Sequence, residues 1–275
     1  MLGVPLITKE KVVGVLEVIN KRNSNFTDAD EDLLVVLGAQ AAVAIENARL
    51  FQQSDLIAEF VHELRTPLAS ISTATFLLLR PEMAQDQRNQ MIRNIHDEAQ
   101  RLSTMTSAFL DLARLESGRV QFLLTKFDLA PLLEECRQIM QGKAAEEAIS
   151  INIKFPAGFP QVEADRDKLK QVVLNLLSNA IKYNRPNGSV TMSAADLERE
   201  WTLSVRDSGM GIPEKSLPHL FQKFFRVHGS ETKIPGTGLG LSICKQIISG
   251  HGGSIDVESK PGKGTIFVVH MPKGA

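Results

Sequence analysis

The feature that most constrains the fold is a long series of apolar residues spaced by three and four, starting soon after Asp28. Such spacing places one side chain per turn on the same helical face and is typical of helices that pair along a seam. The series is Leu33, Leu37, Ala41, Ala44, Ala48 and Phe51, then Ile57, Val61, Leu64, Leu68, Ile71, Thr75 and Leu78. The step from Phe51 to Ile57 is one residue short of a heptad, so the seam changes phase near Ser54. The change is either a point that absorbs movement of the helix or a fixed imperfection in a paired helix.

A second helix is predicted after residues 80–83, where Pro81 breaks the first one. Its apolar seam is Ile92, Ile95, Ala99, Leu102, Met105, Phe109 and Leu112, and it ends near residues 116–118. Two antiparallel helices expose too much apolar surface to be stable alone. We therefore expect two copies of the chain to form a homodimer through a four-helix bundle.

The first residues of the chain show a different pattern. Two β-branched runs within residues 4–20 flank a charged turn at 8–11 and predict a hairpin. Thr27, with acidic residues directly after it, predicts a helix start. This opening resembles the last third of a GAF sensory domain. Because two strands cannot bury a core, we expect residues 1–27 to be the C-terminal remnant of such a domain, without a ligand pocket of its own.

From Lys126 onward, helical and strand patterns alternate. The expected helices are 128–146, 165–184 and 237–251, and the expected strands are 149–154, 188–196, 200–206, 253–259 and 264–271. We interpret this region as an α/β sandwich in which helices cover one face of a mixed sheet. The whole chain is therefore predicted to be α+β. Its expected parts are a sensor remnant (1–27), a connecting helix (28–54), a helical dimerisation domain (55–120) and a sandwich domain (121–275).

Composition excludes several classes of partner. A net charge of -1 gives no reason to expect nucleic acid or an anionic membrane surface. No apolar stretch approaches the roughly 20 residues needed to span a bilayer. Cys136 and Cys244 lack metal-ligand spacing, so we interpret both as small buried apolar residues in a reducing compartment. We therefore expect a cytoplasmic location.

His62 lies within the first helix in the string H-E-L-R-T-P-L. With Val61 and Leu64 in the seam, His62 and Thr66 fall one turn apart on the outward face. An exposed imidazole can act as a nucleophile, and the adjacent Glu63 can accept its proton. Pro67 leaves one helical carbonyl without its donor and predicts a bend there. A lone surface histidine usually has no such role, and we assign none to His96, His219, His228, His251 or His270.

Three further motifs point to a nucleotide. We expect Asp165 to cap a helix. Asn175, Asn179 and Lys182 then share one face of it, where carboxamide oxygens can ligate Mg²⁺ beside phosphate. Asp207 ends a strand and precedes Gly209 and Gly211, which permit close backbone approach to a base. The run Gly236, Thr237, Gly238, Leu239, Gly240 opens an apolar helix whose free N–H groups suit phosphates.

In this order the motifs resemble those of the sensor histidine kinases of two-component signalling, over residues 55–275. The resemblance implies a phosphoacceptor role for His62, a base role for Glu63 and a role for Thr66 in dephosphorylating a response regulator. It also implies the ATP-binding (Bergerat) fold shared with gyrase, Hsp90 and MutL, with Asn179 as the Mg²⁺ ligand. Asn175 and Lys182 then approach the phosphates, Tyr183 packs by the adenine and Asp207 reads it, with Gly209 and Gly211 beside it.

The resemblance further makes residues 213–235 a mobile lid over ATP. Phe221, Phe224 and Phe225 are expected to anchor this lid, and Lys223 and Arg226 to meet the γ-phosphate or the helix that carries His62. The polar run 227–233 is expected to be its most flexible part. The loop 236–240 binds phosphates in this family, which assigns Gly236, Thr237, Gly238, Leu239 and Gly240 to the cofactor site.

Two alternatives remain for the activity. The gyrase, Hsp90 and MutL relatives activate water with a carboxylate at the position of Asn175, so a hydrolytic ATPase lacks its base here. A free-standing ATPase or serine kinase leaves the His62 segment unexplained, and a nucleotide-binding scaffold leaves the intact motifs unexplained. The sequence therefore predicts an ATP- and Mg²⁺-dependent protein-histidine kinase that phosphorylates His62 and transfers the group to an aspartate of a response regulator.

Overall fold

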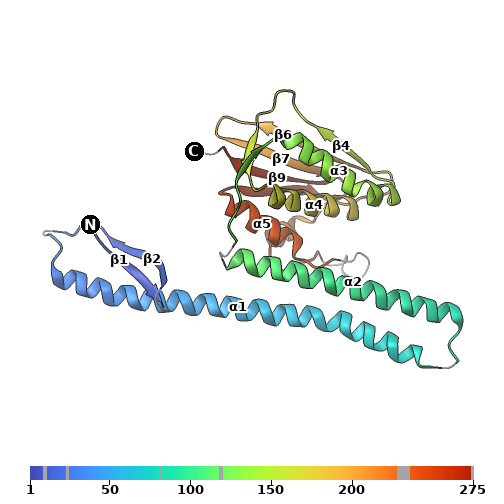
Figure 1. Ribbon diagram of the computed structural model, residues 1–275, viewed down its shortest axis with the longest axis horizontal. Coiled ribbons are helices and arrows are strands. Elements are labelled where there is room, and N and C mark those ends of the chain that lie inside the picture. The colour runs from blue at the N-terminus through green and yellow to red at the C-terminus, as the bar shows by residue number, and fades with distance from the viewer. Residues whose placement is uncertain (9–10, 23–24, 81, 118–119, 228–235, 274–275) are drawn as a thin grey trace. The chain divides into compact units, whose positions relative to one another are not determined.

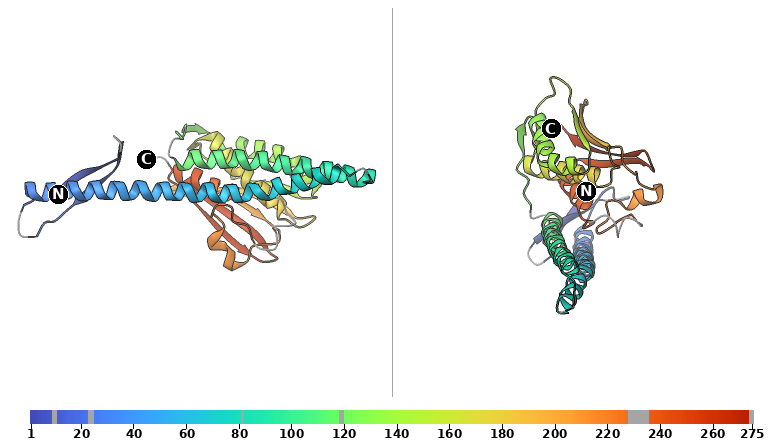
Figure 2. Two further views of the ribbon diagram at one scale, coloured as in Figure 1. Left: turned by 90° about the horizontal axis from the view of Figure 1, so that it is seen from below. Right: turned by 90° about the vertical axis from the view of Figure 1, so that its right-hand side faces the viewer.

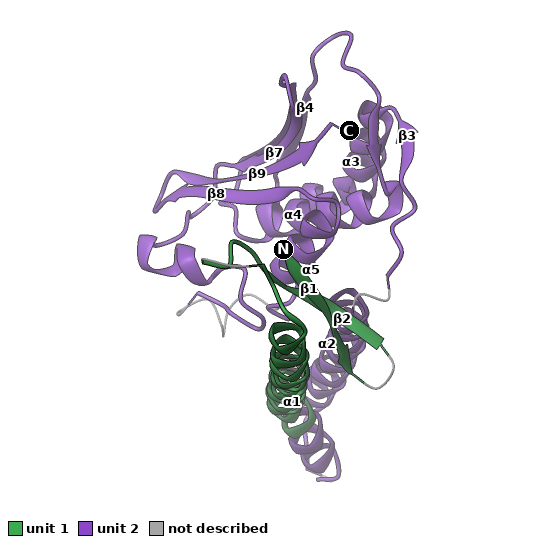
Figure 3. Cartoon of the chain, turned by 90° about the vertical axis from the view of Figure 1, so that its left-hand side faces the viewer, with its two compact units in different colours: residues 1–69 green, residues 70–275 purple. Residues whose placement is uncertain are grey.

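The computed structural model describes residues 1–275 except 9–10, 23–24, 81, 118–119, 228–235 and 274–275 (Figure 1). The chain forms two compact units, residues 1–69 and 70–275 (Figure 3). The division passes through a helix rather than through a linker, so the domain boundaries expected at residues 27, 54 and 120 stay predictions.

The first unit contains the predicted hairpin. Strands β1 (Leu2–Thr8) and β2 (Lys11–Val18) pair antiparallel, and helix α1 (Asp28–Leu78) follows them. Val4 and Leu6 are buried, and a Cβ added to Gly38 of α1 would lie 3.1 Å from Val4 Cγ2 and 3.4 Å from Leu6 Cδ2. The small residue thus lets the strand pack directly on the helix. One hairpin on one helix makes only a small core, as expected for a remnant.

The start of α1 is held by a local network. Thr27 occupies the predicted cap position, and its carbonyl accepts from the N–H groups of Asp30 and Glu31. Its hydroxyl, however, donates to Asp30 Oδ2 at 2.7 Å instead of accepting a helical N–H, and its own N–H donates to the same oxygen at 2.7 Å. Lys21 also pairs with this carboxylate. The hydrogen bond from Lys21, followed by those from Thr27, lowers the pKa of Asp30 to about 2.

The helical hairpin has the predicted turn. α1 continues through Pro67 as a single helix to Leu78, and α2 (Gln85–Glu116) begins after the predicted break. Arg88 of α2 donates to the carbonyl of Leu78 at 3.2 Å. This contact satisfies one of the backbone acceptors that a helix leaves unpaired at its C-terminal end.

The remainder of the second unit is a helix-on-sheet sandwich (Figures 1 and 2). Its sheet has the order β4-β6-β7-β9-β8, with β4 and β6 parallel and the other pairs antiparallel. The strands are β4 (Ser150–Lys154), β6 (Ser189–Asp196), β7 (Glu200–Asp207), β8 (Ser254–Lys260) and β9 (Gly264–Pro272). The helices are α3 (Leu129–Glu146), α4 (Arg166–Lys182) and α5 (Gly240–Gly250). They cover one face of the sheet, which confirms the predicted fold class.

The core of the sandwich lies between these two layers. Leu176 and Leu177 of α4 and Ile247 of α5 are fully buried, as are Val190 of β6 and Leu203 of β7. The two cysteines are free and buried, as predicted, and burial raises the pKa of Cys136 to about 11 and that of Cys244 to about 12.

Three short elements were not predicted: strands β3 (Thr125–Phe127) and β5 (Val162–Ala164), which pair antiparallel, and the 3₁₀ helix η1 (Glu214–His219). Among the described residues, no helix combines the length and apolar character that crossing a bilayer requires.

Candidate functional site

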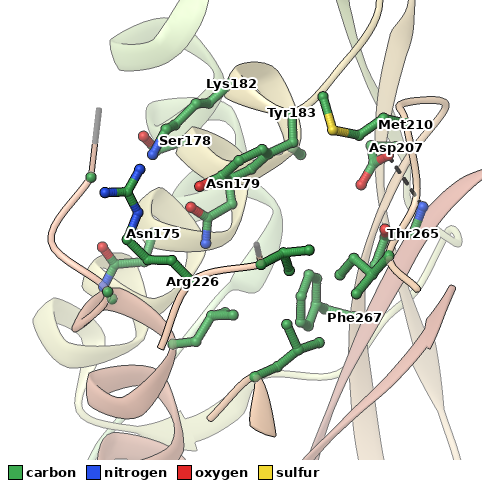
Figure 4. A pocket seen from close by; sticks show the side chains of 18 of the residues that line it. Asn175, Ser178, Asn179, Lys182, Tyr183, Asp207, Met210, Arg226, Thr265 and Phe267 are labelled. Atoms are coloured by element: carbon green, nitrogen blue, oxygen red, sulfur yellow. Dashed lines mark hydrogen bonds between the residues drawn. The ribbon is translucent and has the colours of Figure 1, made fainter. Parts of the chain in front are cut away.

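A cavity of about 700 Å³ lies beside α4 in the second unit (Figure 4). The predicted residues that line it are Asn175, Asn179, Lys182, Tyr183, Asp207, Gly211, Arg226, Gly236, Thr237, Gly238 and Gly240. Of the residues assigned to the cofactor site, Gly209 and Leu239 do not line the cavity. The structure therefore brings together three motifs that are widely separated in the sequence.

Helix α4 presents the amide side chains. Asp165 caps it as predicted, since its Oδ1 accepts from Lys168 N at 3.0 Å. Leu176 and Leu177 are buried, which turns the face that carries Asn175 and Asn179 towards the cavity (Figure 4). The position of the two amides thus follows from the amphipathic pattern of the helix.

Asp207 is the last residue of β7 and lies at one end of the cavity. Its carboxylate is buried, and its Oδ1 accepts from Gly209 N at 2.8 Å and from Thr265 N at 3.1 Å. Burial raises the pKa of Asp207, and these two hydrogen bonds oppose the rise. A Cβ on Gly209 would lie 2.3 Å from the carbonyl oxygen of Tyr183. Only glycine therefore fits at this position, from which the backbone N–H donates to the Asp207 carboxylate.

The opposite end of the cavity is cationic. Lys182, Arg226 and Lys143 of α3 all line it. Burial first, and then the positive charges of Arg226 and Lys143, lower the pKa of Lys182 to about 8. In Figure 4, Asn175, Ser178 and Arg226 lie on one side, and Met210, Asp207 and Thr265 on the other. This polarity suits an elongated ligand with an anionic end and a hydrogen-bonding end.

The glycine loop closes the cavity in front of α5. Gly238 has a φ of +71°, and a Cβ there would lie 2.6 Å from the backbone of Phe224, so only glycine fits. Leu239 is fully buried and holds the N-cap position of α5, and Thr237 Oγ1 accepts from Leu239 N at 3.3 Å. Leu239 thus anchors the loop rather than contacting a ligand by its side chain.

The phenylalanine segment lies between η1 and the glycine loop. Phe224 is buried, and the ring of Phe221 meets that of Phe267 edge-on, with centroids 6.4 Å apart. Phe225 lines the cavity. Lys223 does not: its ammonium group binds Glu116 at the end of α2, at 2.9 Å. The run 228–235, which contains most of the segment expected to be flexible, lies outside the described residues.

Several lining residues were missed by the sequence analysis, among them Lys143, Ser178, Thr265 and Phe267. Ser178 could have been predicted from helical spacing, because Ser178 lies one turn before Lys182 on the same helix. Lys143 and the β9 residues gave no local signal, since they reach the cavity only through tertiary packing.

The phosphoacceptor segment belongs to the first unit. His62 and Thr66 are exposed on α1, as predicted, and Glu63 is half-buried. The outward position of the imidazole leaves it accessible to a reactant.

Three family models match parts of the chain. Residues 1–45 match the GAF domain, residues 52–118 the His Kinase A (phospho-acceptor) domain, and residues 164–275 the histidine kinase-, DNA gyrase B- and HSP90-like ATPase. The His Kinase A match includes His62, and the ATPase match includes all the lining residues of α4, Asp207 and the glycine loop.

Similar proteins include a histidine kinase and a sensor protein. The circadian input-output histidine kinase CikA of Synechococcus elongatus is 32% identical over 84% of this chain and 31% of its own length. The sensor protein SrrB of Staphylococcus aureus is 32% identical over 80% of this chain and 38% of its own. The chain thus spans about a third of the length of these relatives.

Solved structures agree on the fold. Histidine kinase ThkA, in complex with the response regulator protein TrrA, matches with a TM-score of 0.69 and 29% identity over 83% of this chain and 64% of that one. Histidine kinase AdeS of Acinetobacter baumannii matches with a TM-score of 0.65 over 78% of this chain and 98% of that one. At 22% identity, AdeS supports the fold alone.

Proposed function

Because this chain belongs to the sensor histidine kinases and carries a GAF remnant at its start, we propose that it autophosphorylates His62 with ATP. The phosphoryl group then passes to an aspartate of a response regulator. The catalytic part consists of two pieces, the exposed imidazole on α1 and the cavity beside α4.

The observation that carries this proposal is the absence of a hydrolytic base in the cavity. Among the described lining residues, Asp207 is the only carboxylate, and its Oδ1 is occupied by two backbone donors. Position 175, next to the glycine loop, is an asparagine, whose amide cannot take a proton from water. A nucleotide bound here therefore needs a nucleophile from elsewhere, and His62 with Glu63 supplies one.

The residues assigned to the cofactor site divide the binding of ATP among them. Asp207 accepts a hydrogen bond from the adenine amine, and Tyr183 packs beside the ring. The N–H groups of Gly236, Thr237, Gly238 and Gly240 and the cations Lys182 and Arg226 hold the phosphates. A Cβ on Gly211 would lie 2.1 Å from the carbonyl oxygen of Lys260, so Gly211 allows the close turn beside the base.

The residues also fit a magnesium ion. Asn179 offers a neutral oxygen on the cavity face of α4, between the cations and Tyr183, and Asn175 lies one turn before it. Neutral oxygen ligands together with phosphate oxygens are what Mg²⁺ prefers. When bound, the ion neutralises charge on the phosphates.

The transfer itself is a substitution at phosphorus. A ring nitrogen of His62 forms a bond to the γ-phosphorus, the bond from that phosphorus to the bridging oxygen breaks, and ADP leaves. Glu63 accepts the ring proton, a contribution of about 10²–10⁴ in rate. The phosphoryl group then moves from nitrogen to the carboxylate of the regulator, and Thr66 orients a water for its later removal.

The partners follow from the same proposal. ThkA is known in complex with a response regulator, and we assign this chain a partner of the same class. A second copy of the chain completes the helical bundle. We also propose a cytoplasmic location, and the two buried, free thiols and the use of ATP support it.

The test is labelling with γ-³²P-ATP and Mg²⁺. The wild-type protein should acquire label that is labile to acid and stable to alkali, and His62→Gln should acquire none. Asn179→Asp should also abolish labelling, because a carboxylate there repels the phosphates. Release of inorganic phosphate without protein label would instead support a hydrolytic ATPase, and neither product would support a scaffold.

A separate assay tests Thr66. Thr66→Ala should leave His62 labelling unchanged but slow the dephosphorylation of a phosphorylated regulator by at least about tenfold. Equal dephosphorylation rates for Thr66→Ala and wild type would remove Thr66 from the proposal.

A further inference from the structure

One cation reaches the cavity from a helix that carries none of the recognised motifs. Lys143 lies in the last turn of α3, lines the cavity, and places its Nζ 3.4 Å from Ser178 Oγ on α4. Ser178 lies one turn before Lys182, and Figure 4 shows Ser178 on the same side as Arg226. Through this contact with Ser178, Lys143 lies at the cationic end of the cavity.

The charged residues in the middle of α3 form ion pairs. Arg137 pairs with Glu134, and Glu135 pairs with Arg166 and Lys170 of α4. Lys143, in contrast, forms no ion pair with any residue that the structure describes. Its charge instead acts on Lys182, whose pKa it helps to lower.

The cations at this end of the cavity suit an anionic ligand. Lys143, Lys182 and Arg226 share one end of a cavity whose only described carboxylate is at the other end. Lys143 acts on Lys182 as a like charge and lowers its pKa. A polyphosphate bound beside both amines would attract each of them.

We propose that Lys143 is a positioning residue for the polyphosphate of the bound nucleotide, a third cation beside Lys182 and Arg226. The inference rests on the proposed kinase function and deepens it. The ammonium group is exposed and carried on a flexible stem, so it acts as a point charge rather than as a fixed fork. Its contribution is accordingly that of an exposed charge pair, about three- to fivefold in affinity.

The experiment compares Lys143→Gln with Lys154→Gln, an exposed lysine of β4 that does not line the cavity. Binding of ATP is measured by calorimetry, and binding of adenosine by displacement of a fluorescent ATP analogue. Lys143→Gln should bind ATP about three- to fivefold more weakly and adenosine equally well. Lys154→Gln should bind both as wild type does, and Lys143→Arg should restore most of the affinity for ATP.

Salt gives a second readout that a merely structural role would not change. The ratio of ATP affinities between wild type and Lys143→Gln should shrink towards one as ionic strength rises to about 0.5 M, because screening weakens a charge contact. Equal ATP affinities at low salt, or an equal loss of adenosine affinity, would overturn the inference while leaving the kinase proposal intact. A wild-type protein that binds no ATP would overturn both.

Discussion

The pKa of Lys182 depends on whether a phosphate is bound beside it. Burial and the charges of Arg226 and Lys143 lower its pKa to about 8. A polyphosphate beside it favours the charged form and therefore raises that pKa. Above about pH 8, nucleotide binding must be accompanied by proton uptake, and the cost of that uptake grows with pH.

The affinity for ATP should therefore fall as pH rises. Between about pH 7 and about pH 9 we expect a loss of about tenfold, because one proton must be taken up at the higher pH. Calorimetry in buffers of different ionisation enthalpy measures both the affinity and the proton count. Lys182→Arg keeps its charge throughout, so its affinity should be flat over this range. A flat profile for the wild type would contradict the assignment.

Single residues were predictable where the signal was local. Asn175, Asn179 and Lys182 were found by helical spacing, and Asp207 by its place at the end of a strand, and all four line the cavity. Lys143 was not predictable, because it reaches the cavity only through the packing of α3 on α4. Thr265 and Phe267 of β9 were not predictable either, because they reach the cavity only through the pairing of β9 with β7.

At the scale of elements, the segment after α2 is fastened to two helices of the sandwich. Leu123 N donates to Asp165 Oδ2 at 3.0 Å, and Asp165 N donates to His251 Nε2 at 3.0 Å. The ring of Phe122 lies 4.5 Å from that of His251, and a Cβ on Gly250 would lie 2.4 Å from the Phe122 ring. Asp165 is therefore both the cap of α4 and the attachment point of the incoming chain.

Asp165→Ala should consequently destabilise the protein by about 1–3 kcal/mol, since it removes a helix cap and a second hydrogen bond. Urea denaturation of the whole chain measures the change. Asp167→Ala is the matched control: Asp167 is exposed in the same helical turn, and its loss should cost within about 0.5 kcal/mol. Asp165→Asn keeps an acceptor and should fall between the two. Equal stabilities of the two alanine variants would show that the cap contributes little.

The long helices and strands were predicted from the sequence, whereas the short ones were not. Helices with several turns of apolar periodicity and strands of five or more residues were found with small errors at their ends. β3 and β5 have three residues each. A strand of that length offers too few alternations to separate it from a loop, and only its partner defines it.

At the scale of the whole molecule, the seam of α1 remains exposed in the single chain. Ile57 is 54% exposed, Val61 48% and Leu68 54%. These are residues that the periodicity assigned to one face. A contiguous row of half-exposed apolar side chains on a helix is the surface that a second copy buries in a four-helix bundle. The periodicity predicted which face of α1 is apolar, and we expect a second copy of the chain to cover that face.

Leu68→Glu should therefore shift the protein towards monomer. Two symmetry-related leucines are lost from the interface, each worth about 1.5–3 kcal/mol when buried, so the dimer dissociation constant should rise at least about a hundredfold. Light scattering over a dilution series measures it. Thr73→Glu provides the control, because Thr73 is exposed on the outward face of the same helix and should leave the mass unchanged. If Leu68→Glu keeps the wild-type mass at every dilution, this face of α1 does not form the dimer interface, and the bundle must pair through another surface.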